Sequence, residues 1–159
     1  MQTIRIFISS PGDVAEERVK ARHVIEQLQR HYGRRAVLQP VLWEDLPLGA
    51  DVSFQHGIDI VLSEKMRIEI AVFILWSRLG SPPGPPLKAD GTPYRSGTER
   101  EFDLMMQARE QGGEGRPHIL AYTRKDDEAF NAALDAGRSD DSLEELIAQR
   151  KKARQFVEE

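Results

Sequence analysis

One charged residue stands where the sequence predicts the packed face of a helix. At roughly 100° per residue, residues 97–110 place Phe102, Met105 and Ala108 on one apolar arc, with Glu101 near its middle. The opposite arc holds Arg100, Asp103, Gln107 and Glu110. A carboxylate on the packed side of a helix costs free energy unless something there needs it. Glu101 is therefore the first candidate for chemistry.

Glu101 also has a purely structural interpretation. If Thr98 is the N-cap, Glu101 is the third helical residue and completes a capping box. If Ser96 is the N-cap, Glu99 takes that position instead, and we expect Glu99 to be a cap residue or to lie on the surface. Both interpretations of Glu101 stay open on the sequence.

The elements that must position Glu101 alternate between strands and helices. Runs rich in β-branched and apolar residues predict strands at residues 3–8, 36–43, 68–76 and 118–123. Apolar residues at helical spacing predict helices at 14–32, 54–62, 97–110 and 141–159, and residues 125–139 look irregular or weakly helical. Asp13 and Asp141 are the predicted N-caps of the first and last helix. Pro40 indicates that the second strand lies at an edge, and the unbroken apolar third strand indicates burial on both faces.

This alternation predicts an α/β fold, a flavodoxin-like three-layer domain with a parallel sheet in the order 2-1-3-4 and room for a fifth strand. The topological switch then lies between strands 1 and 3, where ligands bind beyond the carboxyl ends of the strands. The loops that meet there are residues 9–13 and the Pro- and Gly-rich residues 77–97, which lead into Glu101. Helix phase and sheet topology therefore bring Glu101 to the same cleft.

Composition narrows the classes of function. The 159 residues suffice for one domain, and the net charge of −4 gives no argument for a nucleic-acid partner. There is no cysteine, no secretion signal and no apolar run long enough for a membrane span, so we expect a cytoplasmic protein without a membrane partner. Histidines and acids lack metal-ligand spacing, so no metal is expected. The last helix reaches residue 159 without a terminating signal, which predicts that residues 1–159 are the N-terminal part of a longer protein.

Three motifs resemble those of a known family. They are FISSPGDV at residues 7–14, FILWSRLGS at 73–81 and GTEREF at 97–102. They resemble the TIR-like domains at the N-terminus of bacterial STAND-type NTPases, which are large signalling receptors. In TIR domains at large, a helix begins Ser-x-x-x-x-Glu-Leu after the third strand, and Ser96 with Glu101 and Phe102 is similar to that pattern. Gly97-Thr98 replaces the usual Trp-Cys pair.

The resemblance implies a signalling effector domain in bacterial antiphage defence. In enzymatic TIR domains this glutamate is required for cleavage of the nicotinamide–ribose bond, so the resemblance implies that Glu101 is catalytic and that NAD is a substrate, with no cofactor. Nicotinamide leaves as a neutral molecule, so one carboxylate that stabilises the cationic ribose is sufficient. The resemblance also implies self-association through TIR-like surfaces, and NTPase and sensor domains in a longer chain.

Six other residues are candidates for binding the nucleotide. Hydroxyl and backbone N–H groups of the first loop suit the diphosphate, a guanidinium suits phosphate and an indole suits a base. Turn formation, helix capping and surface ion pairing are the structural alternatives. The candidates are Ser9, Ser10, Gly12, Trp43, Arg78 and Ser96.

Two other functions remain open on the sequence. One is a non-catalytic adaptor that signals through TIR–TIR contacts. The other is a nucleoside deoxyribosyltransferase-like enzyme, in which the glutamate is a nucleophile and deoxyribosides replace NAD. An open polar pocket with an exposed Glu101 favours an enzyme, and a salt-bridged or capping Glu101 favours an adaptor.

Overall fold

Four parallel strands form a central sheet. A computed structural model describes residues 1–42, 67–112, 115–136 and 140–159. The strands are β1 (Gln2–Ser9), β2 (Ala36–Val41), β3 (Ile70–Leu75) and β4 (His118–Thr123). Their order is β2-β1-β3-β4 and every pairing is parallel, so the predicted α/β architecture and strand order are confirmed. The described residues contain no fifth strand, and the helix predicted at residues 54–62 lies outside them.

Alternation along β1 builds a core on both faces of the sheet. Phe7 packs with Phe73 and Met105 on one face. Ile6 and Ile8 pack on the opposite face, in the cluster that contains Ile25. Successive side chains of a strand point to opposite faces, which is why this apolar run serves two layers. β3 is partly or fully buried along its whole length, as its unbroken apolar sequence predicts.

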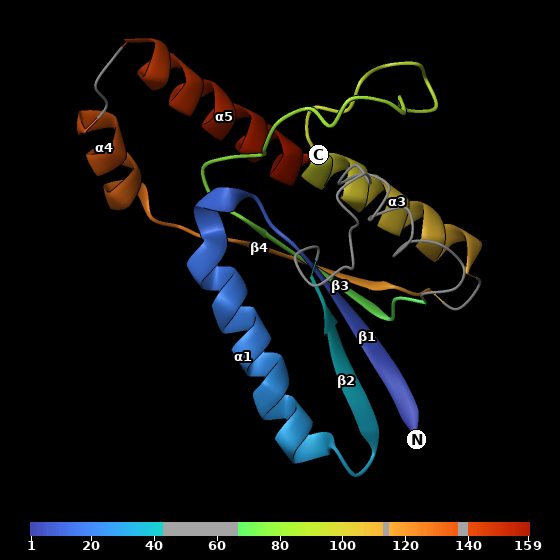
Figure 1. Cartoon of the computed structure of the whole chain (residues 1–159). Coiled ribbons are helices and arrows are strands. Elements are labelled where there is room, and N and C mark those ends of the chain that lie inside the picture. The colour runs from blue at the N-terminus through green and yellow to red at the C-terminus, as the bar shows by residue number, and fades with distance from the viewer. Residues whose placement is uncertain (43–66, 113–114, 137–139) are drawn as a thin grey trace, which may run out of the picture.

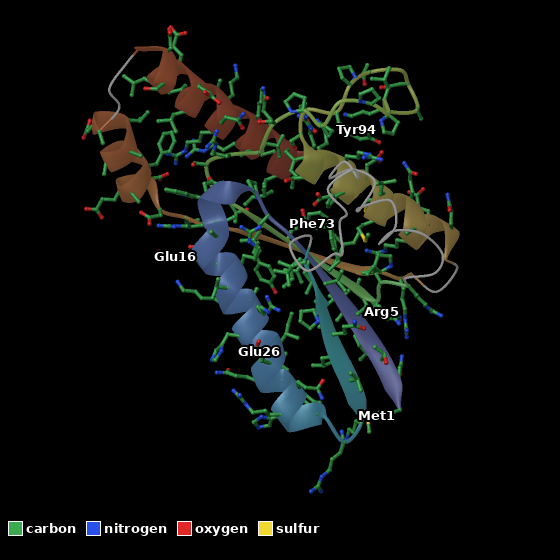
Figure 2. The ribbon with its side chains drawn as sticks, viewed as in Figure 1. Met1, Arg5, Glu16, Glu26, Phe73 and Tyr94 are labelled. Carbon is green, nitrogen blue, oxygen red and sulfur yellow. The ribbon has the colours of Figure 1, made fainter. Side chains whose placement is uncertain are left out.

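Two helices cover the two faces of the sheet. A short 3₁₀ turn, η1 (Gly12–Val14), leads into α1 (Ala15–Tyr32), which covers the face of Ile6 and Ile8. α3 (Gly97–Gln111) covers the other face (Figure 1). Phe73 lies inside the molecule, whereas Glu16 and Glu26 lie on the outer side of α1 (Figure 2).

The C-terminal part of the chain returns across the loop that follows β3. α4 (Asp127–Asp135) forms where the sequence indicates at most weak helix, and α5 (Asp140–Glu158) follows it. Asp141 lies within α5 and is not its N-cap, because the helix begins one residue earlier. α5 buries Ala153 in a cluster with Leu75 and Leu79, and its end lies beside the start of α3 (Figure 1). Among the described residues no helix combines the length and hydropathy that a membrane crossing requires.

Candidate functional site

Glu101 meets Ser9 at the carboxyl end of β1. Ser9 is the last residue of β1 and lies beside Phe73 of β3, at the switch in strand order. Its hydroxyl donates a short hydrogen bond to Oε2 of Glu101, which lies in the second turn of α3. The Ser9 residue is 1% exposed and Glu101 is 6% exposed. Helix phase and sheet topology thus meet at one buried pair of polar side chains.

The burial of Glu101 changes its acidity. Burial raises the pKa of the Glu101 carboxyl from 4.5 to about 7, and the Ser9 hydrogen bond and the Arg100 charge act in the opposite direction. Withdrawal from water penalises the charged form of a carboxyl group. Near neutral pH this group is therefore divided between its charged and neutral forms.

The start of α3 decides between the two capping interpretations. Ser96 is the N-cap, and its Oγ accepts a hydrogen bond of 3.0 Å from the backbone N–H of Glu99. The capping interpretation of Glu101, which needs Thr98 as the N-cap, is therefore wrong. Ser96 is fully buried, and its hydroxyl already serves the helix.

The first turn of α3 is enclosed, and two of its charged residues are buried. Glu99, expected as a cap or surface residue, is 5% exposed, so the surface alternative is wrong, but its Oε2 accepts a hydrogen bond of 2.6 Å from the backbone N–H of Arg95 just before the N-cap. Glu99 also pairs with Lys88 at 2.9 Å and Arg95 at 2.8 Å. Burial on its own raises the pKa of Glu99, but the hydrogen bonds from Arg95 and Lys88 outweigh it and hold the pKa below its usual value. Arg100, predicted on the outer arc, is 3% exposed. Lys88 and Arg95 belong to residues 76–96, the long loop that supplies the partners of Glu99.

The C-terminal residues, at and just after the end of α5, contact residues at the start of α3 and in the loop before it. Glu159 accepts hydrogen bonds of 3.1 and 2.6 Å from the Arg95 guanidinium. Phe156 contacts Phe102 edge-to-face, with ring centroids 5.3 Å apart. Phe102 contacts Phe73 in the same way, with ring centroids 5.2 Å apart. These contacts fix the first turns of α3, and with them the backbone that carries Glu101.

Asp13 joins two loops instead of capping α1. The N-cap of α1 is Val14, which has no side-chain cap, because the 3₁₀ turn precedes the helix. Asp13 Oδ2 accepts hydrogen bonds from the backbone N–H of Ser77 at 3.0 Å and from the Ser77 hydroxyl at 2.9 Å. The loops after β1 and β3 are thereby tied together at the edge of the sheet where Ser9 lies.

Removal of the Asp13 carboxylate is expected to destabilise the fold. Asp13→Ala leaves two donors of Ser77 without their acceptor, at an expected cost of about 1–3 kcal/mol in the free energy of unfolding. Urea denaturation measures this loss. The control Glu16→Ala removes a neighbouring exposed carboxylate and should change stability by about 0.5 kcal/mol or less. Equal losses in the two variants would contradict a special role for the Asp13–Ser77 contact.

Of the predicted binding residues that the structure describes, only Ser9 hydrogen-bonds to Glu101. Arg78 is exposed and pairs with Glu145 of α5 at 3.6 Å, which is the surface alternative. Gly12 is exposed on η1, and Trp43 lies outside the described residues. Ser10 is half-buried, and its hydroxyl oxygen is fully buried without a hydrogen-bond partner. Within the described ranges no group of three or more histidines and acids is arranged to hold a metal ion.

Gln149 of α5 is a buried polar residue that was not predicted, although the sequence carries a signal for it. Its side-chain Oε1 accepts hydrogen bonds of 3.2 Å from the backbone N–H groups of both Leu79 and Gly80, and its Nε2 donates to Gly80 O at 3.3 Å. Gln149 lies on the apolar stripe of α5 between Leu146 and Ala153. A polar residue on an apolar stripe is the same signal that marks Glu101.

Comparison of the chain with protein-family models, with curated proteins and with solved structures found no match. Function is therefore inferred from the Ser9–Glu101 pair, from its place at the end of β1, and from the motifs of the sequence.

Proposed function

We propose that this chain is a TIR-like effector domain that hydrolyses the nicotinamide–ribose bond of NAD when it self-associates. The observation that carries the proposal is the buried hydrogen bond from Ser9 to Glu101 at the carboxyl end of β1. Open α/β sheets bind their ligands at such a switch in strand order. The proposed setting is a bacterial STAND-type receptor of the cytoplasm, with NTPase and sensor domains in a longer chain and a role in antiphage defence.

The proposed reaction needs one carboxylate from the protein. Water adds to the anomeric carbon of the ribose while the carbon–nitrogen bond to nicotinamide breaks. The bonding electron pair returns to the pyridinium nitrogen, nicotinamide leaves as a neutral molecule, and the water loses a proton. Positive charge develops on the ribose in the transition state, and the Glu101 carboxylate stabilises it electrostatically. Ser9 acts as a positioning residue, because its hydroxyl fixes the orientation of the carboxylate.

The exposed Glu101 carboxylate expected of an enzyme is not found, so the proposed reaction needs an event that opens the site. The residue is 6% exposed, so a ribose reaches its carboxylate only after surrounding side chains move. Self-association is the event proposed to open the site. The same low exposure supports the second candidate function, a non-catalytic adaptor in which Glu101 is only a buried structural residue.

The pH dependence of the reaction follows from the pKa of Glu101. The charged carboxylate is the active form, so the rate of nicotinamide release should rise with pH. Its midpoint should lie above the usual 4.5 and no higher than about 7, because opening the site returns the carboxyl partly to water. In Ser9→Ala the midpoint should move to higher pH, because the Ser9 hydrogen bond lowers this pKa. A profile of kcat/KM against pH for the two proteins measures both effects. A profile without a step between pH 5 and 9 would contradict the assignment of Glu101.

One assay separates the candidate functions. The chain is fused to a domain that forces oligomers and is incubated with NAD or with a deoxyribonucleoside and a free base, and the products are separated by chromatography. Nicotinamide release supports the NAD hydrolase, and the same run distinguishes free from cyclised ADP-ribose. Base exchange between deoxyribosides identifies a deoxyribosyltransferase. Inactivity of the forced oligomer toward both substrates supports the adaptor.

A further inference from the structure

The two edge strands of the sheet, β2 and β4, differ in whether their sequence hinders pairing with a further strand. At the β2 edge, Pro40 has no N–H group to offer to another strand. The β4 edge contains no proline and no Lys, Arg, Asp or Glu, and five of its six residues are exposed. Natural sheets usually protect their edges with charges, prolines or covering elements, so a bare edge rich in β-forming residues is suited to pairing with another strand.

The backbone of β4 presents a regular set of hydrogen-bonding groups on its outer side. The N–H groups of His118 and Arg124 donate toward β3, to Glu69 and Leu75. Along a strand these groups alternate between the two sides. The N–H and C=O groups of Ile119, Ala121 and Thr123 therefore point away from β3. Among the described strands, none pairs with this side of β4.

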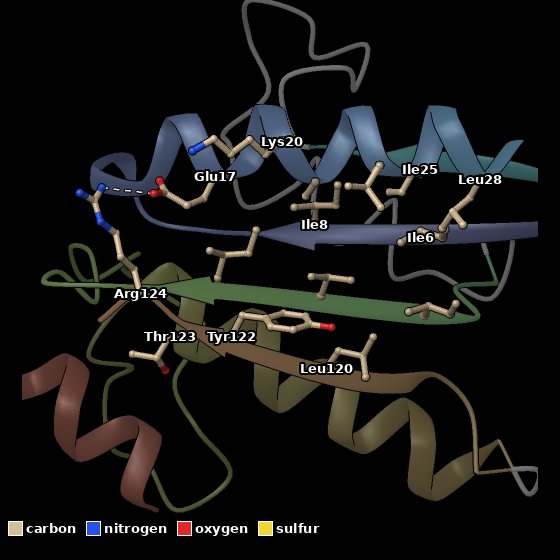
Figure 3. Close-up of a pocket in the computed structure, with 15 residues that line it drawn as sticks. Ile6, Ile8, Glu17, Lys20, Ile25, Leu28, Leu120, Tyr122, Thr123 and Arg124 are labelled. Carbon is tan, nitrogen blue, oxygen red and sulfur yellow. Dashed lines mark hydrogen bonds and ion pairs between the residues drawn. The ribbon is translucent and has the colours of Figure 1, made fainter. Parts of the chain in front are cut away.

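An apolar groove continues from this edge to α1. Leu120 and Tyr122 lie on the face that α1 covers, and they are 43% and 56% exposed. They line a groove of about 630 Å³ together with Ile6 and Ile8 of β1 (Figure 3). Side chains of α1 line its other wall, including Val24, Ile25 and Leu28. The groove leaves room on this face for side chains from outside the chain.

We propose that a second copy of this chain pairs with β4, antiparallel and about a two-fold axis, and joins two four-stranded sheets into one. A register centred on Ala121 suits both the outward backbone groups and the exposed side chains of β4. It brings the outward groups of Ile119, Ala121 and Thr123 into hydrogen-bonded pairs with those of the other copy. It also places Leu120 of each copy opposite Tyr122 of the other, as a non-hydrogen-bonded pair, in which side chains lie closest.

A second copy of the chain is the partner that fits this surface, because the edge of β4 is complementary to itself. A two-fold contact requires one surface to match itself. This face of β4 carries His118, Leu120 and Tyr122, all exposed. The aliphatic Leu120 and the aromatic Tyr122 are spaced two apart, so each lies opposite the other across the axis. Aromatic–aliphatic pairs of this kind stabilise neighbouring strands. The small Ala121 side chain lies at the axis on the opposite face. The inference stands on the sheet edge alone and holds whether or not the chain cleaves NAD.

Sedimentation velocity over a range of protein concentrations tests the interface. The wild-type chain should associate to a dimer, and Tyr122→Lys should raise the dissociation constant by about tenfold or more, because the substitution removes both symmetric pairs. The matched control is Ile147→Lys, which changes an equally exposed apolar residue of α5 away from β4. A wild-type chain that stays monomeric at every concentration would overturn the proposal. Equal effects of the two substitutions would overturn it too.

Hydrogen exchange provides a test that needs no variant. In a β4–β4 dimer the backbone N–H groups of Ile119, Ala121 and Thr123 become protected as the concentration rises, while the N–H groups of Leu120 and Tyr122 are protected at all concentrations. Ala121→Pro removes one outward N–H group and leaves the bonds to β3 in place, so it should also weaken association. Concentration-independent exchange at the three outward groups would show that β4 is not the interface.

Discussion

Glu101→Gln should reduce nicotinamide release from NAD by about 100- to 1000-fold in forced oligomers, with the fold intact. Glutamine has nearly the same shape, and its amide oxygen still accepts a hydrogen bond from Ser9. What the substitution removes is the negative charge beside the ribose, which acts only when positive charge develops there. The loss should therefore appear in kcat as well as in kcat/KM. Single-turnover release of nicotinamide, with circular dichroism as the measure of folding, tests this expectation.

The control for this substitution lies on the same helix. Glu110 is exposed near the end of α3, so Glu110→Gln makes the same chemical change away from the site and should leave the rate unchanged. Equal rates for the wild type and Glu101→Gln would remove Glu101 from the mechanism. If the oligomer proves inactive before any substitution, the adaptor function is favoured over the enzyme.

The sheet could be predicted because its signals are local. Apolar runs gave the strand bounds to within two residues, Pro40 marked an edge strand, and alternation with helices gave the parallel order. Glu101 could also be placed, since the phase of a helix tells which side chains face the sheet. Ser9 follows from topology, because the last residue of β1 lies at the switch.

The enclosure of the first turn of α3 could not be predicted in the same way. Helix phase compares the faces of one helix and does not tell which other segments cover them, and Glu99 and Arg100 are both buried. The groups that hold Glu99 come from the loop before the helix, and Glu159 reaches Arg95 from the far end of the chain. Asp13 and Ser77 lie 64 residues apart. No local pattern contains such long-range partners.

A polar residue on an apolar stripe identifies burial without identifying function. Glu101 and Gln149 both carry this signal, and both are buried. Gln149 satisfies the backbone of a loop at Leu79 and Gly80, which is a structural role. Glu101 is ionisable, binds another side chain and lies at the switch in strand order. Charge and place in the fold separate the two residues, and the structure adds the partners that each one binds.

Replacement of Glu101 should also change how the free energy of unfolding depends on pH. The pKa of its carboxyl is raised from 4.5 to about 7 in the folded chain. Between these values the unfolded chain releases the proton and the folded chain keeps it, so the free energy of unfolding falls as the pH rises, by about 3 kcal/mol in all. This contribution is fully present below pH 4.5 and is lost as the pH passes through about 7. Glutamine has no proton to lose, so Glu101→Gln should gain stability relative to the wild type from acid to mildly alkaline pH.

Urea denaturation of the two proteins at about pH 4.5 and pH 8 measures this difference. All other ionisable groups are shared, so subtracting one protein from the other isolates residue 101. Glu110→Gln serves again as the exposed control, and its difference from the wild type should vary by less than about 0.5 kcal/mol. A constant difference for Glu101→Gln would mean that folding does not raise the pKa of the Glu101 carboxyl. The midpoint of nicotinamide release should then lie near the usual pKa of 4.5, because the buried site sets its upper limit.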